Sequence, residues 1–102
     1  MRLRLSPSVP GDLEEIAEHI AQDSPRHATR MLRLLRARMK EIARNPKIHR
    51  LRPEIGVEAR LATVGNYVIL FRIRRNTVRI ERVVHGSRDL LSILKETENR
   101  SA

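Results

Sequence analysis

Apolar and polar positions alternate most regularly between residues 67 and 84, where two alternating runs flank a polar break. A period of two sends successive side chains to opposite faces of a strand, so each run predicts a β-strand. The break, Arg75-Asn76, predicts a tight turn, because Asn tolerates a left-handed backbone. We therefore predict a β-hairpin. Matching its apolar faces sets the register as Ile73 opposite Val78, Phe71 opposite Ile80 and Tyr67 opposite Val84.

The same register places Arg72 of the first strand opposite Arg79 of the second. Like charges at directly opposed positions of a sheet repel each other. This face of the hairpin is therefore expected to be wet, or to bind something anionic. Arg72 and Arg79 become candidates for contact with a target.

Two stripes of apolar residues at three- and four-residue spacing precede the hairpin and predict two helices. The first stripe begins at Leu13, with Ser6 or Ser8 as the expected cap. The second follows Ser24-Pro25, a capping signal, and stops at Asn45-Pro46. The short break between the stripes predicts an antiparallel helical hairpin that packs on the sheet.

The remaining segments complete an α+β pattern. Residues 2–5 alternate Arg and Leu and predict an N-terminal strand, residues 59–63 predict another strand, and residues 90–94 predict a short C-terminal helix. The order of the elements favours helices on one face of a largely antiparallel sheet. The 102 residues contain no linker rich in Pro, Gly or Ser, so residues 1–102 are expected to form a single domain.

Composition removes several classes of function. The chain has no Cys, which excludes disulfides, thiolate nucleophiles and Cys-based zinc sites. Its four His are scattered without metal-ligand spacing, and we predict neither a metal nor a cofactor. No run approaches the roughly 18 apolar residues of a membrane span, and the N-terminus lacks the apolar stretch of a signal peptide. A cytoplasmic protein is expected.

The formal net charge of +9 is concentrated in one segment. Residues 26–52 contain ten Lys or Arg and one acid, Glu41, whereas the rest of the chain has eleven residues of each sign. Such a stripe usually indicates an anionic partner, either nucleic acid or an acidic protein. Tyr67 and Phe71 are the only Tyr, Phe or Trp residues, and both lie on the predicted core face. We therefore do not expect bases to stack on this protein or nucleic acid to bind it directly.

Motifs for catalysis are missing, because the chain has no Gly-rich phosphate loop and no G-x-S-x-G elbow. Glu14, Glu15 and Glu18 are interpreted as a solvated helix face. The loop after the second hairpin strand holds His85, Arg88 and Asp89. Imidazole can act as an acid or a base, and Arg can hold a phosphate or a carboxylate. A structural alternative stays open, in which Asp89 caps the last helix and Arg88 pairs with a carboxylate.

Several motifs resemble the RelE/ParE superfamily of toxins from bacterial type II toxin–antitoxin modules, and within it the ParE branch. They lie in order along the chain: Asp12-Leu13-Glu14-Glu15-Ile16, Asn45-Pro46, Arg52-Pro53-Glu54-Ile55-Gly56, Val64-Gly65-Asn66-Tyr67 and Arg82-Val83-Val84-His85-Gly86-Ser87-Arg88-Asp89-Leu90. The resemblance implies a small α+β domain that poisons DNA gyrase. It also implies a cognate ParD-like antitoxin whose C-terminal segment wraps around the toxin.

The RelE branch, which cleaves mRNA on the ribosome, is similar in fold. Its motif places an Arg directly after the aromatic residue that opens the central strand, where this chain has Val68, and a Tyr or His near the C-terminus, where nothing after His85 qualifies. We therefore predict a non-enzymatic toxin, with a ribosome-dependent endoribonuclease or a decayed toxin that only binds its antitoxin as alternatives. The target-binding candidates are His85, Arg88, Asp89, Arg72 and Arg79. The antitoxin-binding candidates are Leu13, Ile16, Ile20, Met31, Leu35, Arg33, Arg36 and Lys40.

Overall fold

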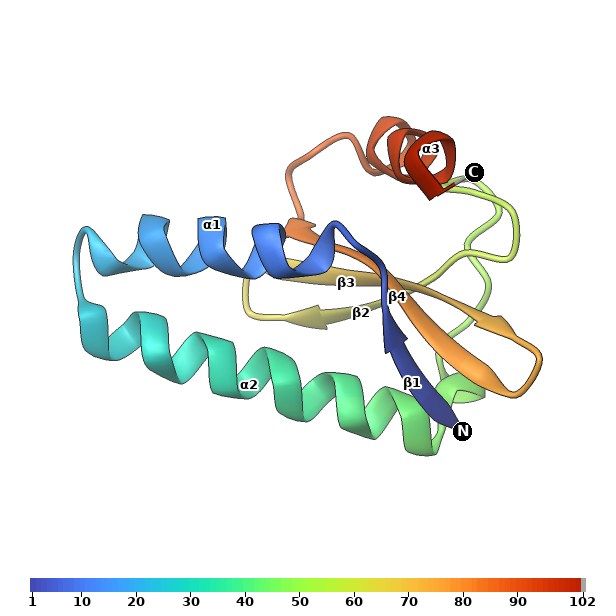
Figure 1. Ribbon diagram of the computed structural model, residues 1–102, viewed down its shortest axis with the longest axis horizontal. Helices are drawn as coiled ribbons and strands as arrows, with labels where there is room; N and C mark the ends of the chain where they lie inside the picture. Colours follow the sequence, from blue (N-terminus) through green and yellow to red (C-terminus); the bar gives the residue numbers. More distant parts are fainter. Residues whose placement is uncertain (102) are drawn as a thin grey trace.

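A computed structural model describes the backbone of residues 1–101 and the side chains of residues 1–98. The elements follow in this order: β1 (Arg2–Leu5), α1 (Val9–Ala21), α2 (Pro25–Arg44), the short 3-10 helix η1 (Pro46–Ile48), β2 (Arg60–Val64), β3 (Tyr67–Arg74), β4 (Thr77–His85) and α3 (Leu90–Ser101). A helical hairpin lies beside a sheet, and a further helix follows the sheet (Figure 1). The predicted α+β class is confirmed.

The four strands form one sheet in the order β1-β4-β3-β2. β1 runs parallel to β4, and the other neighbours are antiparallel, so the sheet is largely antiparallel as predicted. The turn between β3 and β4 falls at Arg75 and Asn76, whose φ angles of 45° and 62° are both left-handed. Two left-handed residues are what a tight hairpin needs to match the twist of its strands.

The predicted register holds at the turn and fails further away. Ile73 pairs with Val78 and Phe71 with Ile80. A β-bulge lies between Leu70 and Phe71, so that Glu81 has no opposite residue in β3. One extra residue reverses the alternation beyond it. Tyr67 therefore pairs with His85 rather than Val84. As a consequence Val83 joins the core beneath the helical hairpin, and Val84 joins a second cluster on the opposite face.

The helical hairpin covers one face of the sheet. Ser24 caps α2, because its Oγ accepts a hydrogen bond from the His27 N–H at 3.2 Å. α1 begins at Val9, four residues before the predicted Leu13, with Ser8 at the capping position but without a side-chain capping bond. The fixed φ of Pro10 suits the first turn of a helix, which explains the earlier start.

The apolar face of this hairpin forms the main core, which corrects part of the predicted antitoxin surface. Leu13 and Ile16 of α1 and Leu35 of α2 are 7%, 6% and 0% exposed. They pack against the sheet and are therefore not available to a partner. Ile20 and Met31 are partly buried against the same core.

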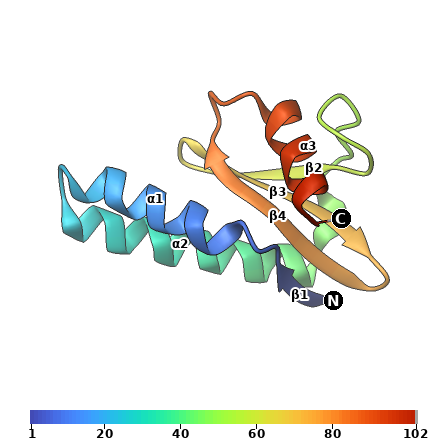
Figure 2. The same cartoon turned by 45° about the horizontal axis from the view of Figure 1, so that its top comes forward.

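The opposite face of the sheet is covered by α3, so the helices do not lie on one face only (Figure 2). Ile93 and Leu94 of α3 pack there with Val68, Leu70 and Val84. Residues 52–59 contribute to the same cluster, since Ile55 and Ala59 belong to it. The sheet thus has an apolar layer on each side.

The predicted wet face at Arg72 is wrong. Arg72 does pair with Arg79 across the strands, but its side chain is only 3% exposed. Its Nε donates to the Val57 carbonyl oxygen at 2.8 Å, and its guanidinium contacts the carboxylates of Glu81 and Glu98. Glu81 also pairs with Arg79 at 2.8 Å. A carboxylate shared by the two guanidinium groups explains why like charges can lie side by side.

Candidate functional site

A hollow of about 550 Å³ opens between α1, the end of β4 and the loop that follows it. β1 pairs with β4 only as far as Ile80, so on that edge the last residues of β4 face α1, while their other edge pairs with β3. The hollow is mainly polar, and its lining combines acidic, basic and imidazole groups. Its polar lining residues are Asp12, Glu15, Glu18, His19, Gln22, Tyr67, Arg82, His85, Ser87 and Arg88.

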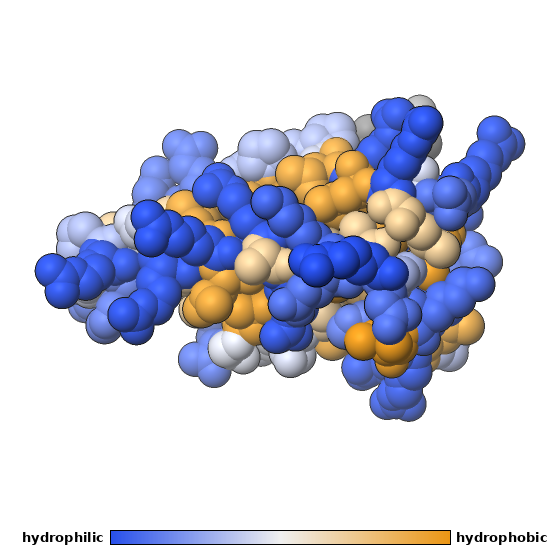
Figure 3. Space-filling view, turned by 90° about the horizontal axis from the view of Figure 1, so that it is seen from below, coloured by the Kyte–Doolittle hydropathy of each residue, from blue (hydrophilic) through white to orange (hydrophobic). Residues whose placement is uncertain are grey.

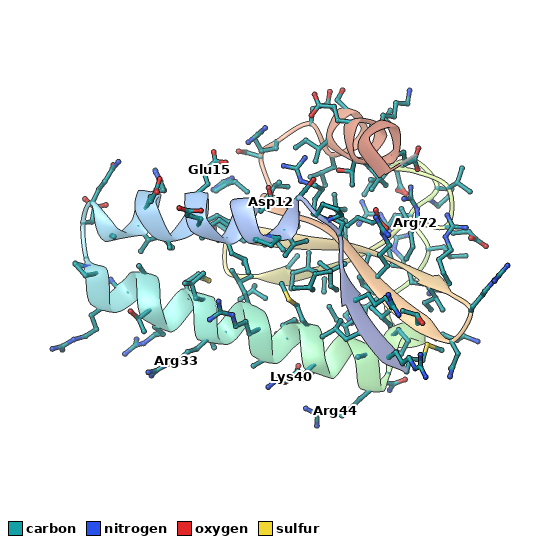
Figure 4. All side chains as sticks on the ribbon, in the orientation of Figure 1. Asp12, Glu15, Arg33, Lys40, Arg44 and Arg72 are labelled. Carbon is teal, nitrogen blue, oxygen red and sulfur yellow. The ribbon has the colours of Figure 1, made fainter. Side chains whose placement is uncertain are left out.

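One wall is a buried ion pair between α1 and β4. Arg82 donates from Nε and Nη2 to both carboxylate oxygens of Asp12, at 2.8 and 2.7 Å. The Val83 N–H donates to the same carboxylate at 2.9 Å, so Asp12 takes the place of a neighbouring strand. The hydrogen bonds that Arg82 donates to Asp12 are the main cause of the raised pKa of Arg82. The charge of Arg82 is thus already paired within the fold. Figure 4 shows Asp12 and Glu15 on α1.

Residues 85–88 form the rim, and hydrogen bonds hold the loop in place. The Gly86 N–H donates to the Asn66 carbonyl oxygen at 2.8 Å, which ties the loop to the turn between β2 and β3. The Arg88 N–H donates to the His85 carbonyl oxygen at 3.0 Å. The rings of His85 and Tyr67 meet edge to face, with 5.6 Å between their centroids. The predicted loop is therefore fixed in position although its side chains are exposed.

The local bonds determine how His85 can act. Its Nδ1 accepts the Ser87 N–H at 3.1 Å and lies 2.8 Å from Ser87 Oγ. Because Nδ1 is an acceptor, the neutral ring carries its proton on Nε2. His85 can then offer a donor from Nε2 to a partner, while the serine stabilises the turn.

Asp89 and Arg88 have different roles. Asp89 accepts hydrogen bonds from the N–H and the Oγ of Ser92, at 3.3 and 2.8 Å, and these bonds lower its pKa. It caps α3, so the structural alternative is confirmed for Asp89, which does not line the hollow. Arg88 lines the hollow and is exposed, and within residues 1–98 no carboxylate forms an ion pair with it.

The structure does not bring the other two target candidates to this site. Arg79 lies six residues before His85 on β4, which is about 20 Å along a strand. Arg72 lies beside Arg79 and is buried. Both belong to the opposite end of the hairpin.

Sequence reasoning missed the residues that α1 contributes. Glu15 and Glu18 are exposed, as the solvated-face interpretation predicts, and they also line the hollow together with His19 and Gln22. The signal was present in the spacing, because Asp12, Glu15, His19 and Gln22 follow one another at three- and four-residue intervals. Residues at these intervals share one side of a helix.

The basic stripe lies on the outer surface of α2. Arg33, Arg36 and Lys40 are exposed. Arg33, Lys40 and Arg44 point away from the sheet in Figure 4. Among the described side chains, one ion pair lies within α2, between Arg38 and Glu41 at 3.2 Å. Figure 3, seen from the side of α2, shows hydrophilic side chains with apolar areas between them, and Leu34 on α2 is 49% exposed.

Two classes of feature do not occur in the part of the chain that the structure describes. No group of three or more His, Asp or Glu side chains there is arranged to hold a metal ion. No described helix is long and apolar enough to cross a membrane.

The arrangement of a strand, a helical hairpin, three further strands and a C-terminal helix defines the class, a small α+β domain with a polar hollow at one end of its sheet. The family described as ParE toxin of type II toxin-antitoxin system, parDE, matches residues 3–90, and the chain belongs to this family. The predicted ParE branch is confirmed.

A solved structure of a chromosomal ParDE toxin–antitoxin system from P. aeruginosa is similar in fold. The TM-score is 0.73 at 19% sequence identity, and the similarity covers 83% of this chain and 95% of the other. A comparison with curated proteins gave no match.

Proposed function

We propose that this ParE-family toxin acts in the cytoplasm by binding DNA gyrase, without catalysis, and that a cognate ParD-like antitoxin holds it inactive. The observation that carries the proposal is the rigid loop at the hollow between α1 and the end of β4, which we call the first hollow. Arg88 is exposed there without an ion pair from residues 1–98, beside a His85 that can donate from Nε2. Loops held on a rigid scaffold are well suited to present binding groups.

The position of Val68 supports a non-enzymatic mode. Val68 is 7% exposed and packs in the apolar cluster beneath α3, at the position where the RelE branch carries an Arg. A charged group is costly in such a cluster unless it is paired. Val68 has no ionisable group, so general acid–base chemistry on a ribose hydroxyl would have to use other residues.

Expression of the toxin without its antitoxin tests the proposal. We expect purified toxin to inhibit supercoiling by gyrase, DNA breaks to accumulate in cells, and mRNA to stay intact. Cuts at defined codon positions in mRNA together with normal gyrase activity would instead establish the endoribonuclease. Binding of the antitoxin with neither effect would show a decayed toxin.

For the antitoxin, the structure changes the surface that we propose. The exposed basic residues Arg33, Arg36 and Lys40 remain, together with the half-exposed Leu34 on α2 and Leu5 on β1. β1 is an edge strand of the sheet, so its outer side can accept an added segment. An amphipathic segment with acidic residues fits this combination, a common mode for chains that fold on binding.

A further inference from the structure

A second hollow, of about 510 Å³, lies at the other end of the sheet beside the turn between β3 and β4. It is lined by Arg4, Arg72, Arg74, Arg75, Thr77, Arg79, Glu81 and Glu98. Five arginines against two glutamates leave a formal excess of three positive charges. This is a dense group of guanidinium groups on so small a surface.

Strand register explains how the arginines come together. Arg4 of β1 pairs with Arg79 of β4, and Arg79 pairs with Arg72 of β3. Directly paired residues of neighbouring strands project to the same face of a sheet, and the strands lie about 4.8 Å apart. The three side chains therefore form a row across the sheet, on the side where α3 lies, which we call the arginine row.

The inner end of the arginine row is already occupied by carboxylates of the chain itself. Glu98, on α3, reaches Arg72, and Glu81 contacts both Arg72 and Arg79, at 3.8 and 2.8 Å. The fold therefore shows that this hollow receives carboxylates, and guanidinium groups match carboxylates well.

The outer end of the row, at Arg4, and the turn residue Arg75, which lines the same hollow, are not occupied in this way. Among the described side chains, neither Arg4 nor Arg75 takes part in an ion pair, and both are exposed. Arg74 is paired with Glu58 at 3.5 Å, but both side chains are largely exposed, so this pair contributes little. Positive charge is thus left over next to the sites that carboxylates already occupy.

We propose that Arg4, at the outer end of the arginine row, and Arg75, in the turn that lines the same hollow, bind carboxylate side chains of an acidic peptide segment from a partner protein. The carboxylates that the hollow already holds favour this ligand over nucleic acid. The lining contains no aromatic ring on which a base could stack. The proposal does not depend on gyrase as the target, and the antitoxin enters only as one protein that could supply such a segment.

Spectra of the arginine Nε–Hε groups of the full chain test this directly. We expect hexaglutamate to shift the signals of Arg4 and Arg79 saturably and a neutral hexaserine to leave them unchanged. Arg4→Gln combined with Arg75→Gln should weaken binding by about tenfold, since two charged contacts are lost. Amide spectra of this variant show whether it stays folded.

A charge-matched control separates a site from general attraction. Arg26→Gln combined with Arg50→Gln removes the same charge from exposed positions outside the hollow, and binding should stay within about twofold of the wild type. An equal loss in both double variants, or no saturable shift in the wild type, overturns the proposal. Tighter binding of pyrophosphate than of hexaglutamate at the same signals does so too. None of these outcomes bears on gyrase inhibition, which is measured separately.

Discussion

Arg82 and Arg88 both line the first hollow, but only one of them has its charge committed to the fold. Arg82 is locked to Asp12 by two hydrogen bonds, whereas no described carboxylate pairs with Arg88. A positive group that is exposed and unpaired keeps its full interaction for a partner. Together with His85 it defines the surface that toxicity should depend on.

The first prediction concerns the substitution of Arg88 and His85. Arg88→Ala and His85→Ala should both abolish or strongly reduce toxicity in cells, because each removes an exposed group of the rim. Neither change opens an apolar cavity, so both variants should stay folded and keep antitoxin affinity within about tenfold. Growth assays and calorimetry measure the two effects. Arg50→Ala, an exposed arginine outside the hollow, is the control and should remain toxic. Two folded variants with full toxicity would show that the loop is structural.

His49 gives a prediction about pH. Burial lowers its pKa, and the positive charges of Arg38 and Arg60 lower it further, while its ring packs edge to face on Phe71 at 5.5 Å. The folded state then binds the proton less readily than the unfolded state, whose His has an ordinary value of 6.5. The free energy of unfolding is therefore unaffected by His49 above that value. It decreases as the pH falls from there through the lower, folded pKa.

The measurement compares urea unfolding at about pH 7.5 and about pH 5.5, where His titrates. The wild type should lose more stability over this interval than His49→Gln, which cannot titrate. The pKa values of Glu54 and Asp89 are also lowered, but their ordinary values of 4.5 and 3.8 lie below the interval. An equal loss in both proteins would exclude His49 as the source.

At the scale of elements, the contact between α3 and the irregular segment before β2 depends on one glycine. A Cβ at Gly56 would lie 2.5 Å from Leu94 Cδ2 and 3.3 Å from Arg72 Nη2. Leu94 is 1% exposed, so it cannot move aside easily. We expect Gly56→Ala to destabilise the protein by about 1–3 kcal/mol through overpacking.

Gly11 offers the matched control, because a Cβ there would meet nothing within 4 Å. It lies inside α1, where Ala is favoured over Gly by about 0.5–1 kcal/mol. Gly11→Ala should therefore raise stability slightly while Gly56→Ala lowers it, which urea denaturation can show. If Gly56→Ala were as stable as the wild type, the packing of α3 would be looser than the structure indicates.

The elements that the sequence predicts well are those with local signals. The caps and stops of α2, the tight turn at Arg75-Asn76 and the register beside it depend on residues close in the chain. The first hollow could be anticipated only at its rim, from His85 and Arg88, because its other wall comes from α1. No local pattern states which helix will face the end of β4.

Two misses share one physical cause, the bulge at Glu81. The predicted register rests on a strict period of two, but Val83 and Val84 are successive apolar residues that point to opposite faces of the strand. The pairing of Arg72 with Arg79 predicts a wet second face. The carboxylates that resolve this conflict come from Glu81 in the bulge and from Glu98, which is 26 residues after Arg72.

At the scale of the whole molecule, exposed positive charge lies in three separate regions. The basic stripe lies on the outer side of α2, the arginine row lies at the turn between β3 and β4, and the rim with Arg88 lies at the other end of β4. A partner that wraps around the toxin could cover the first without touching the rim. The proposed antitoxin and gyrase surfaces are therefore separable by mutation.

The basic stripe should govern how fast the antitoxin binds. Long-range attraction raises association rates and is screened by salt, and the screening length falls severalfold between about 50 mM and about 500 mM salt. We expect the association rate, measured by stopped flow, to fall by about tenfold or more over this range, since steered complexes lose their advantage at high salt. Replacement of Arg33, Arg36 and Lys40 by Gln should remove most of this dependence. Replacement of Arg74, Arg88 and Lys95, which are exposed and lie outside residues 26–52 and outside β1, removes the same charge elsewhere and should preserve it. An association rate that does not change with salt would show that the stripe does not guide the antitoxin.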